Sequence, residues 1–192
     1  MNIWVTSDTH FSHYNIIKYC NRPFTSIKEH DETLIDNWNF LVQPNDLVYH
    51  LGDVIFGSRE HCIELLSRLN GKIFLISGNH DKCALRQEVR TRFIDVKQLH
   101  QIKYVLNNTT FELVLCHYAM RVWNKCHHGS LHCFGHSHGK LVGGRSSMDV
   151  GVDVNNFRPI HINKVIELLT DTDTAEYELT TSDSIYVEIE EK

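Results

Sequence analysis

Short apolar runs in the first half of the chain alternate with segments whose apolar residues recur at helical spacing. The runs at residues 2–7, 46–50 and 72–77 predict buried strands. Between them, residues 27–42 and 58–69 each place apolar side chains on one face of a helix. This alternation favours parallel βαβ units and therefore an α/β fold.

Local signals mark the ends of the two predicted helices. Ser26 and Glu29 have the spacing of a capping box, and Pro44 follows the first helix. Ser58 can cap the second helix, and Gly71 is suited to end it. Both helices are therefore expected to pack against the strands through their apolar faces.

The pattern changes after about Phe93, where short strands dominate. Residues 102–106 and 110–116 flank Asn107-Asn108, which favours a hairpin turn. Further short strands are predicted at residues 131–134, 141–142 and 148–152. This half of the chain is therefore expected to form a second sheet.

The chain has 192 residues, enough for one domain with a full hydrophobic core. Residues 1–169 are expected to form this domain, with a last helix that Asn163 can cap. Residues 170–192 are acidic and rich in Thr and Ser, and we expect a peripheral extension there. Within it, residues 184–190 alternate in the manner of an edge strand.

Charge and composition narrow the possible partners and the compartment. The net charge of −5 argues against extended duplex nucleic acid as a partner. No apolar run is long enough to span a membrane, and the chain starts directly in a strand instead of a signal peptide. The six cysteines form no CxxC pair. We therefore expect a reduced, cytoplasmic protein.

Side chains that can bind metals recur where predicted strands end. They are Asp8, His10, Asp53, Asn79, His117, His136 and His138. Seven ligands are too many for one tetrahedral ion and suit two ions that share a bridging group. Oxygen and nitrogen ligands without thiolate favour Mn, with Fe, Zn or Ni as alternatives. Two such ions can clamp a phosphate and convert a bound water to hydroxide.

Alternation along an extended backbone suggests how two of these motifs are built. Asp8 and His10 are two residues apart, so in an extended segment their side chains face the same side. Asn79 and His80 are adjacent, so in an extended segment they face opposite sides. Most of the other histidines among the 14 are expected at the surface, including His30, His61 and His100.

The order of these motifs resembles the calcineurin-like metallophosphoesterase superfamily. The motifs are Asp8-x-His10, Gly52-Asp53, Gly78-Asn79-His80-Asp81, His117 and Gly135-His136-x-His138. Five blocks in this order make chance agreement very rare. The resemblance implies a four-layer αββα sandwich with two mixed β-sheets. The short chain is similar to compact bacterial and phage phosphoesterases, whose substrates are often phosphodiesters or nucleotides.

The resemblance also implies a role for each residue. Asp8, His10 and His138 would hold the first ion, Asn79, His117 and His136 the second, and Asp53 would bridge both. His80 would contact the phosphate and protonate the leaving group. The resemblance assigns no ion to Asp81, and we expect this residue to orient the loop or His80 instead.

One departure from the family pattern concerns the substrate. Protein phosphatases of this superfamily have an acid and a phosphate-binding arginine where this chain has Phe56 and Gly57. A phosphoprotein substrate is therefore disfavoured. Candidate substrate contacts are His13, Asn15, Arg121 and Arg145, although solvent-exposed arginines explain the last two equally well.

Two other functions and a second metal site are compatible with parts of the sequence. A nuclease acting on short nucleic acid would use the same ligands. A non-catalytic scaffold of this fold would have lost ligands, whereas all seven are present here. A separate structural zinc site could use Cys126-His127-His128 with His132-Cys133, although this spacing matches no common zinc finger. The sequence therefore favours a dimetal phosphoesterase.

Overall fold

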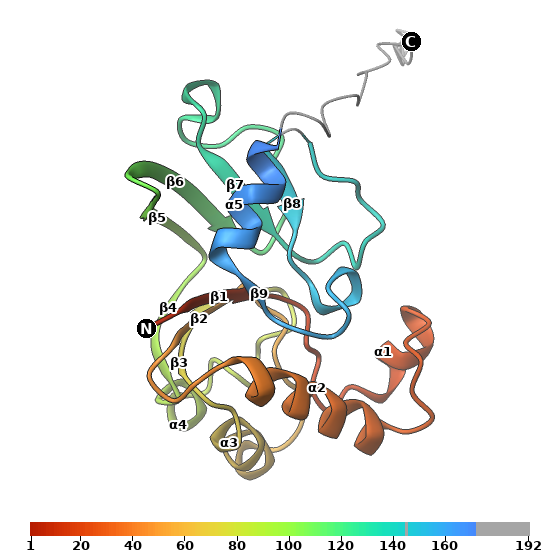
Figure 1. The fold of residues 1–192 in the computed structure, drawn as a ribbon. Coiled ribbons are helices and arrows are strands. Elements are labelled where there is room, and N and C mark those ends of the chain that lie inside the picture. The colour runs from red at the N-terminus through yellow and green to blue at the C-terminus, as the bar shows by residue number, and fades with distance from the viewer. Residues whose placement is uncertain (145, 172–192) are drawn as a thin grey trace, which may run out of the picture.

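The computed structural model describes residues 1–144 and 146–171, which form two β-sheets (Figure 1). The strands are β1 Ile3–Thr6, β2 Leu47–His50, β3 Lys72–Ile76, β4 Phe93–Lys97, β5 Leu99–Leu106, β6 Thr109–Cys116, β7 Leu131–Phe134, β8 Ser147–Asp149 and β9 Ile160–His161. The helices are α1 Tyr14–Tyr19, α2 Ile27–Leu41, α3 Arg59–Ser67, α4 Gln87–Arg90 and α5 Ile162–Thr170, with short 3-10 helices at Cys126–His128 and Val152–Val154.

Both sheets are mixed. The first has the order β4-β3-β2-β1-β9, in which only β9 is antiparallel to its neighbour. The second has the order β5-β6-β7-β8, in which β5 and β6 form an antiparallel hairpin and the other pairs are parallel. The prediction of an α/β fold with two mixed sheets is therefore confirmed.

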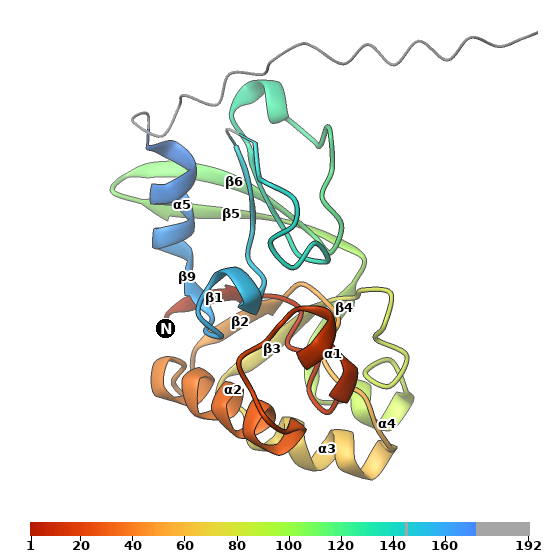
Figure 2. The ribbon, with the colours of Figure 1, turned by 90° about the vertical axis from the view of Figure 1, so that its right-hand side faces the viewer.

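Apolar residues that alternate along the strands build a core on each face of the first sheet. Val48 in β2 packs in a cluster with residues of α2 and α3, whereas its neighbour Tyr49 joins a cluster shared with the second sheet and α5. Figure 2 shows α2, α3 and α4 on one side of this sheet and β5, β6 and α5 on the other. The first sheet is therefore the central layer of the molecule.

Met120 and Trp123, in the loop between β6 and β7, lie against His132 of β7. His132 in β7 is fully buried, and its Nδ1 lies 2.9 Å from the carbonyl oxygen of Val114. Its Nε2 accepts a hydrogen bond from Met120 N at 3.1 Å, and the ring of Trp123 lies 5.1 Å away. Because both nitrogens of His132 are engaged with the backbone, this histidine does not serve the structural zinc site considered above.

The predicted helix starts are confirmed at two positions and wrong at a third. Ser26 Oγ accepts a hydrogen bond from Glu29 N, and Ser58 caps α3 in the same way. Asn163 does not cap α5. The cap is His161, whose Nδ1 accepts from Asn163 N, while Asn163 Oδ1 accepts from the Tyr104 hydroxyl at 2.7 Å.

The strand predictions differ from the structure mainly at short elements. The sequence pattern missed β4 and β9, and residues 141–142 form no strand. The strand predicted at 148–152 is β8 followed by the second 3-10 helix. From residue 172 onwards, the predicted extension and its edge strand at 184–190 lie outside the described residues. None of the described helices is long and apolar enough to cross a membrane.

The expectation of a fully reduced chain is wrong for one cysteine pair. Cys62 and Cys83 form a disulfide across a sequence separation of 21 residues. Cys62 lies on the buried face of α3, and Cys83, in the loop after β3, joins the same apolar cluster as this helix. Their pairing results from this packing, which their spacing in the sequence does not indicate.

Asp46 fastens the start of β1 to the turn before β2. This residue is 3% exposed. Its carboxylate accepts hydrogen bonds from Asn2 N at 2.7 Å, Trp4 Nε1 at 3.1 Å and Gln43 N at 3.1 Å. Burial alone would raise the pKa of Asp46, but these hydrogen bonds outweigh it and lower the pKa to about 2.

We expect Asp46→Asn to lower the free energy of unfolding at pH 7 by about 2 kcal/mol. Because the pKa of Asp46 is lower in the folded than in the unfolded protein, its contribution is present above about pH 4 and is lost as the pH falls towards 2. Urea unfolding with chelator at pH 7 and pH 3 measures this. A difference between variant and wild type that is equal at both pH values would contradict the assignment.

Candidate metal centre

The structure brings the predicted ligand residues together at one edge of the two sheets. Asp8 and His10 follow β1, Asp53 follows β2, Asn79 follows β3, His117 follows β6, and His136 and His138 follow β7. Each of these strands runs parallel to a neighbour, so their carboxyl ends meet at the same edge. Chemistry at the carboxyl ends of parallel strands is the common arrangement in α/β proteins.

The ligand atoms form two adjacent groups. The first contains Asp8, His10 and His138, and the second contains Asp53, His117 and His136, with the ligand atoms of each group within 4.8 Å of one another. Asn79 adjoins the second group, because its Oδ1 lies 3.1 Å from His117 Nε2. The geometry thus separates these side chains into two sets of three or four.

One carboxylate oxygen lies between the two groups. Asp53 Oδ2 is 3.6 Å from His10 Nε2 and 3.6 Å from His117 Nε2. The other oxygen, Oδ1, accepts a hydrogen bond from His80 N at 2.8 Å, which fixes the orientation of the carboxylate. Asp53 is therefore placed to serve both groups at once.

Hydrogen bonds orient two of the imidazoles. His117 Nδ1 lies 2.7 Å from the carbonyl oxygen of Leu51, and His138 Nδ1 lies 2.7 Å from Asp153 Oδ2. In each ring this leaves Nε2 for the site, as is usual for histidines that bind metals. Burial alone would lower the pKa of His138, but its hydrogen bonds to Asp153 and Cys20 outweigh burial and raise the pKa to about 10.

Buried polar atoms without partners show that the two groups suit cations. Asp8 is fully buried, and its Oδ1 has no hydrogen-bond partner in the described structure. Burial raises the pKa of Asp8 to about 7, although His117 and His138 act in the opposite direction. Both ring nitrogens of His10 are also buried without a partner. A carboxylate and an imidazole in this state are costly unless a cation coordinates them, so the donor set fits two divalent ions.

The backbone is left-handed at five of the seven ligand residues, which corrects the expectation of an extended segment at Asp8 and His10. The φ angles are 57° at Asp8, 50° at His10, 57° at Asp53, 66° at His136 and 49° at His138. Such conformations cost about 1–3 kcal/mol each and persist only where surrounding contacts hold them. Asp8 and His10 therefore converge through tight turns and not through strand alternation.

A close approach between two loops explains the glycine before His136. A Cβ atom on Gly135 would lie 2.0 Å from Ser7 Oγ and 2.4 Å from Asp8 Oδ2. The next residue, His136, donates its backbone N–H to Asp8 Oδ2 at 2.8 Å. The loops after β1 and β7 are thus in direct contact, and a larger residue at position 135 would separate the two sheets' ligands.

Asp81 holds the loop that carries Asp53. It is fully buried, and its carboxylate accepts from Gly78 N at 2.7 Å, Asp53 N at 3.0 Å and Val54 N at 2.8 Å. Of the two roles that the sequence left open for Asp81, the geometry therefore favours orientation of the loop over orientation of His80.

His80 is exposed beside the first group and close to an aromatic pair. Its ring centroid lies 5.9 Å from that of His10 and 5.7 Å from that of Phe56. His13 stacks on Phe56 with ring centroids 4.2 Å apart, and its buried Nδ1 has no partner among the described residues. Asn15 is exposed on α1. The structure thus places His13 and His80 near each other, with ring centroids 6.5 Å apart.

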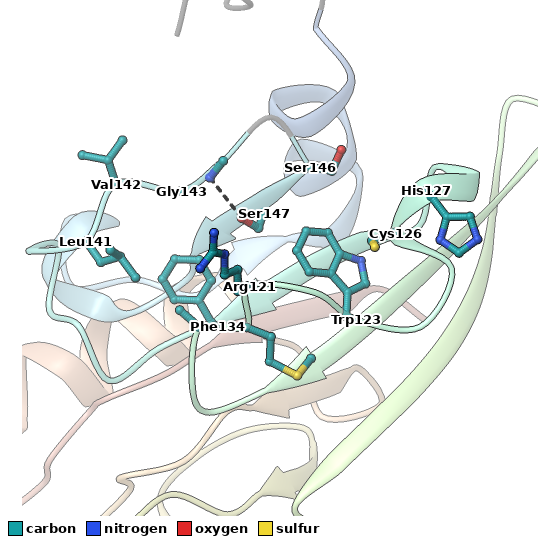
Figure 3. Close-up of a pocket in the computed structure, with 13 residues that line it drawn as sticks. Arg121, Trp123, Cys126, His127, Phe134, Leu141, Val142, Gly143, Ser146 and Ser147 are labelled. Atoms are coloured by element: carbon teal, nitrogen blue, oxygen red, sulfur yellow. Dashed lines mark hydrogen bonds between the residues drawn. The ribbon is translucent and has the colours of Figure 1, made fainter. Parts of the chain in front are cut away.

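One of the two predicted arginine contacts lies among the described residues. Arg121 is exposed and lines a cavity of about 620 Å³ between the loops that follow β6 and β7, where Figure 3 shows it among Trp123, Phe134 and Leu141. Arg145 lies outside the described residues.

Arg22 and Asp153, which the sequence pattern did not indicate, support the first group. Arg22 is 4% exposed and pairs with Asp153, which in turn contacts His138. His30 was expected at the surface but is fully buried between Arg22 and Asp31. None of these residues lies at a strand end, so no local motif marks them. His61 is exposed, as expected.

Known proteins resemble this chain in sequence and in fold. An uncharacterised protein of Methanocaldococcus jannaschii is 35% identical over 170 residues, covering 87% of this chain and 90% of that protein. The Gene 66 protein of Mycobacterium phage L5 is 37% identical over 83 residues, covering 42% of this chain and 40% of that protein. A protein of unknown function from Aquifex aeolicus has a similar fold, with a TM-score of 0.64 at 20% identity over 87% of this chain and 98% of that one.

A family model described as calcineurin-like phosphoesterase matches residues 1–145, which include all seven ligand residues. This match and the two groups of ligands agree on a dinuclear site for divalent metal ions. The chain therefore belongs to the calcineurin-like phosphoesterase family and is a metal-dependent phosphoesterase.

Proposed function

We propose that this phosphoesterase hydrolyses a phosphodiester or nucleotide-type substrate, with Asp53 shared by two metal ions and His80 assisting the leaving group. The observation that carries the proposal is the position of Asp53 Oδ2, 3.6 Å from an imidazole nitrogen of each ligand group. A single carboxylate between two ligand sets is the arrangement that a two-ion phosphoesterase needs.

The ligand groups support one assignment. Asp8, His10 and His138 would hold the first ion, Asn79, His117 and His136 the second, and Asp53 both. When bound, two divalent ions supply Lewis-acid charge to a phosphate and lower the pKa of water. The carboxylate, amide and imidazole ligands of these two groups favour Mn, with Fe, Zn or Ni as alternatives.

His80 is suited to act on the substrate because it is fixed by its backbone and free at its side chain. Its backbone N–H donates to Asp53 Oδ1 at 2.8 Å, while the residue is exposed. The ring lies beside His10, at the edge of the first ligand group. From this position the imidazole would hydrogen-bond the phosphate and give a proton to the departing oxygen.

The surroundings of Phe56 favour a small phosphodiester over a phosphoprotein. Gly57 offers no guanidinium at the position of the protein-phosphatase arginine, and the ring of Phe56 stacks on His13. His13, Asn15, Arg121 and Arg145 remain candidates for contacts with the rest of the substrate. The net charge of −5 favours a short ligand over duplex nucleic acid.

We expect His80→Ala to keep two bound ions and to lose diester turnover by about 10²- to 10⁴-fold, because the variant lacks the acid for the leaving group. Turnover of bis-p-nitrophenyl phosphate and metal content by atomic emission measure the two effects. His128→Ala, at an exposed histidine in the Cys126–His128 turn, is the matched control. Unchanged turnover in His80→Ala would remove this residue from the mechanism.

We expect a chelator to abolish hydrolysis and added Mn²⁺ to restore it, with linear or cyclic diesters turned over faster than monoesters. A substrate panel with p-nitrophenyl phosphate, bis-p-nitrophenyl phosphate, cyclic nucleotides and short oligonucleotides tests this. Preference for monoesters would contradict the proposed substrate class. Preference for oligonucleotides would indicate a nuclease.

A further inference from the structure

We propose that Arg22 is a positioning residue that shapes the first-ion half of the metal centre without binding an ion or the substrate. This inference rests on the proposed assignment of Asp8, His10 and His138 to one ion. The guanidinium of Arg22 is buried, with a side-chain exposure of 0%. It lies behind this ligand group and contacts its backbone.

Every N–H group of the guanidinium has an acceptor. Nε donates to Asp153 Oδ1 at 2.8 Å, and Nη2 donates to Asp153 Oδ2 at 2.7 Å and to the carbonyl oxygen of Asp8 at 2.7 Å. Nη1 lies 3.0 Å from the carbonyl oxygen of Thr9 and 2.7 Å from His30 Nε2. A guanidinium carries five donors in a fixed plane, so this site uses its full capacity.

The two carbonyl contacts hold the turn that carries Asp8 and His10. Both residues have left-handed backbones, with φ of 57° and 50°. The backbone N–H groups of Asp8 and His10 donate to the carbonyl oxygens of Gly52 and Asp53. The carbonyl oxygens of Asp8 and Thr9 accept hydrogen bonds from the Arg22 guanidinium, so both kinds of backbone group in the turn are held. Without Arg22, two buried carbonyl groups would lose their donor, and the costly turn would relax.

Asp153 links Arg22 to His138, the third ligand of the first group. It binds Arg22 through both oxygens, and Oδ2 also lies 2.7 Å from His138 Nδ1. The carboxylate therefore sets the ring orientation of His138 and leaves Nε2 for the ion. Arg22 thus supports all three side chains of the first group, two through the backbone and one through Asp153.

The network continues away from the site and anchors Arg22 to α2. His30 Nε2 faces Arg22, and His30 Nδ1 lies 2.8 Å from Asp31 Oδ1. Asp31 in turn accepts hydrogen bonds from the backbone N–H and the hydroxyl of Ser12. Residues 8–12 are therefore tied to the helix through two separate routes, which leaves the guanidinium little freedom to move.

The second group is supported by different residues. His117 is oriented by the carbonyl oxygen of Leu51, and the loops of Asp53 and Gly78 are held by Asp81. In the described residues, the hydrogen bonds of Arg22 reach none of these groups. Loss of the guanidinium should therefore weaken the first ion selectively.

Mn²⁺ titration of the full chain by calorimetry tests this with Arg22→Lys, which keeps the charge but not the planar set of donors. We expect the affinity for one ion to fall by about 10- to 100-fold and the other to stay unchanged. Arg68→Lys, at an exposed arginine paired with Glu32, is the matched control and should bind both ions normally. Melting in excess chelator reports any loss of fold independently of the ions.

Single-ion backgrounds identify which ion is affected. In Asn79→Ala, which removes a ligand of the second ion, Arg22→Lys should still weaken binding. In His10→Ala, which removes a ligand of the first ion, it should have no effect. Equal weakening in both backgrounds, or none in either, would overturn the role of Arg22.

Two further results keep the inference separate from the proposed function. If Arg22→Lys does not fold, Asp153→Asn is measured in the same backgrounds and judged by the same outcomes, because it removes the carboxylate that joins Arg22 to His138. Wild-type protein that binds fewer than two ions would overturn the proposed dinuclear site itself. Two ions in the wild type with unchanged binding in the variants would overturn the inference alone.

Discussion

The structure depends on the gathering of carboxylates and imidazoles in a place where little water can reach them. Asp8, His10, Asp53 and His117 are each at most 2% exposed. Asp8 Oδ1 and both ring nitrogens of His10 have no hydrogen-bond partner in the described structure. Burying polar atoms in this state costs several kcal/mol, whereas divalent ions would satisfy them together. The left-handed backbones at Asp8, His10 and Asp53 add to this cost. Contacts in the rest of the molecule must therefore offset this cost and keep the loops that carry the ligand residues together.

These loops follow parallel strands of two sheets, and the strands end at the same edge. The central first sheet has an apolar cluster on each face, one shared with α2 and α3 and the other with the second sheet and α5. Around the ligand residues, hydrogen bonds with polar side chains, and not apolar packing, hold the loops in place. Asp81 holds the Asp53 loop, and Arg22 with Asp153 holds the Asp8 turn and His138. The metal centre is thus held by two sets of polar side chains, and these rest on a sheet that is packed by apolar residues on both faces.

Much of this arrangement could be predicted from the sequence because short motifs of neighbouring residues specify it. Strand-end motifs such as Gly52-Asp53 combine a turn residue with a ligand, and helix caps such as Ser26 have fixed spacing. Features created by tertiary contact carry no such signal. Arg22 and Asp153 are 131 residues apart in the sequence, and His30 has the spacing of an ordinary helix residue. The left-handed turn at Asp8 also escaped prediction, because an Asp-x-His sequence is equally compatible with a strand.

The central claim is that Asp53 lies between two metal ions held by separate ligand groups. Anomalous diffraction from crystals grown with Mn²⁺ tests it most directly, because it locates each ion independently of activity. The account predicts two peaks about 3.5–4 Å apart, one beside Asp8 and His10 and the other beside His117 and Asn79, with the Asp53 carboxylate touching both. A single peak, or two peaks that do not share Asp53, would contradict it.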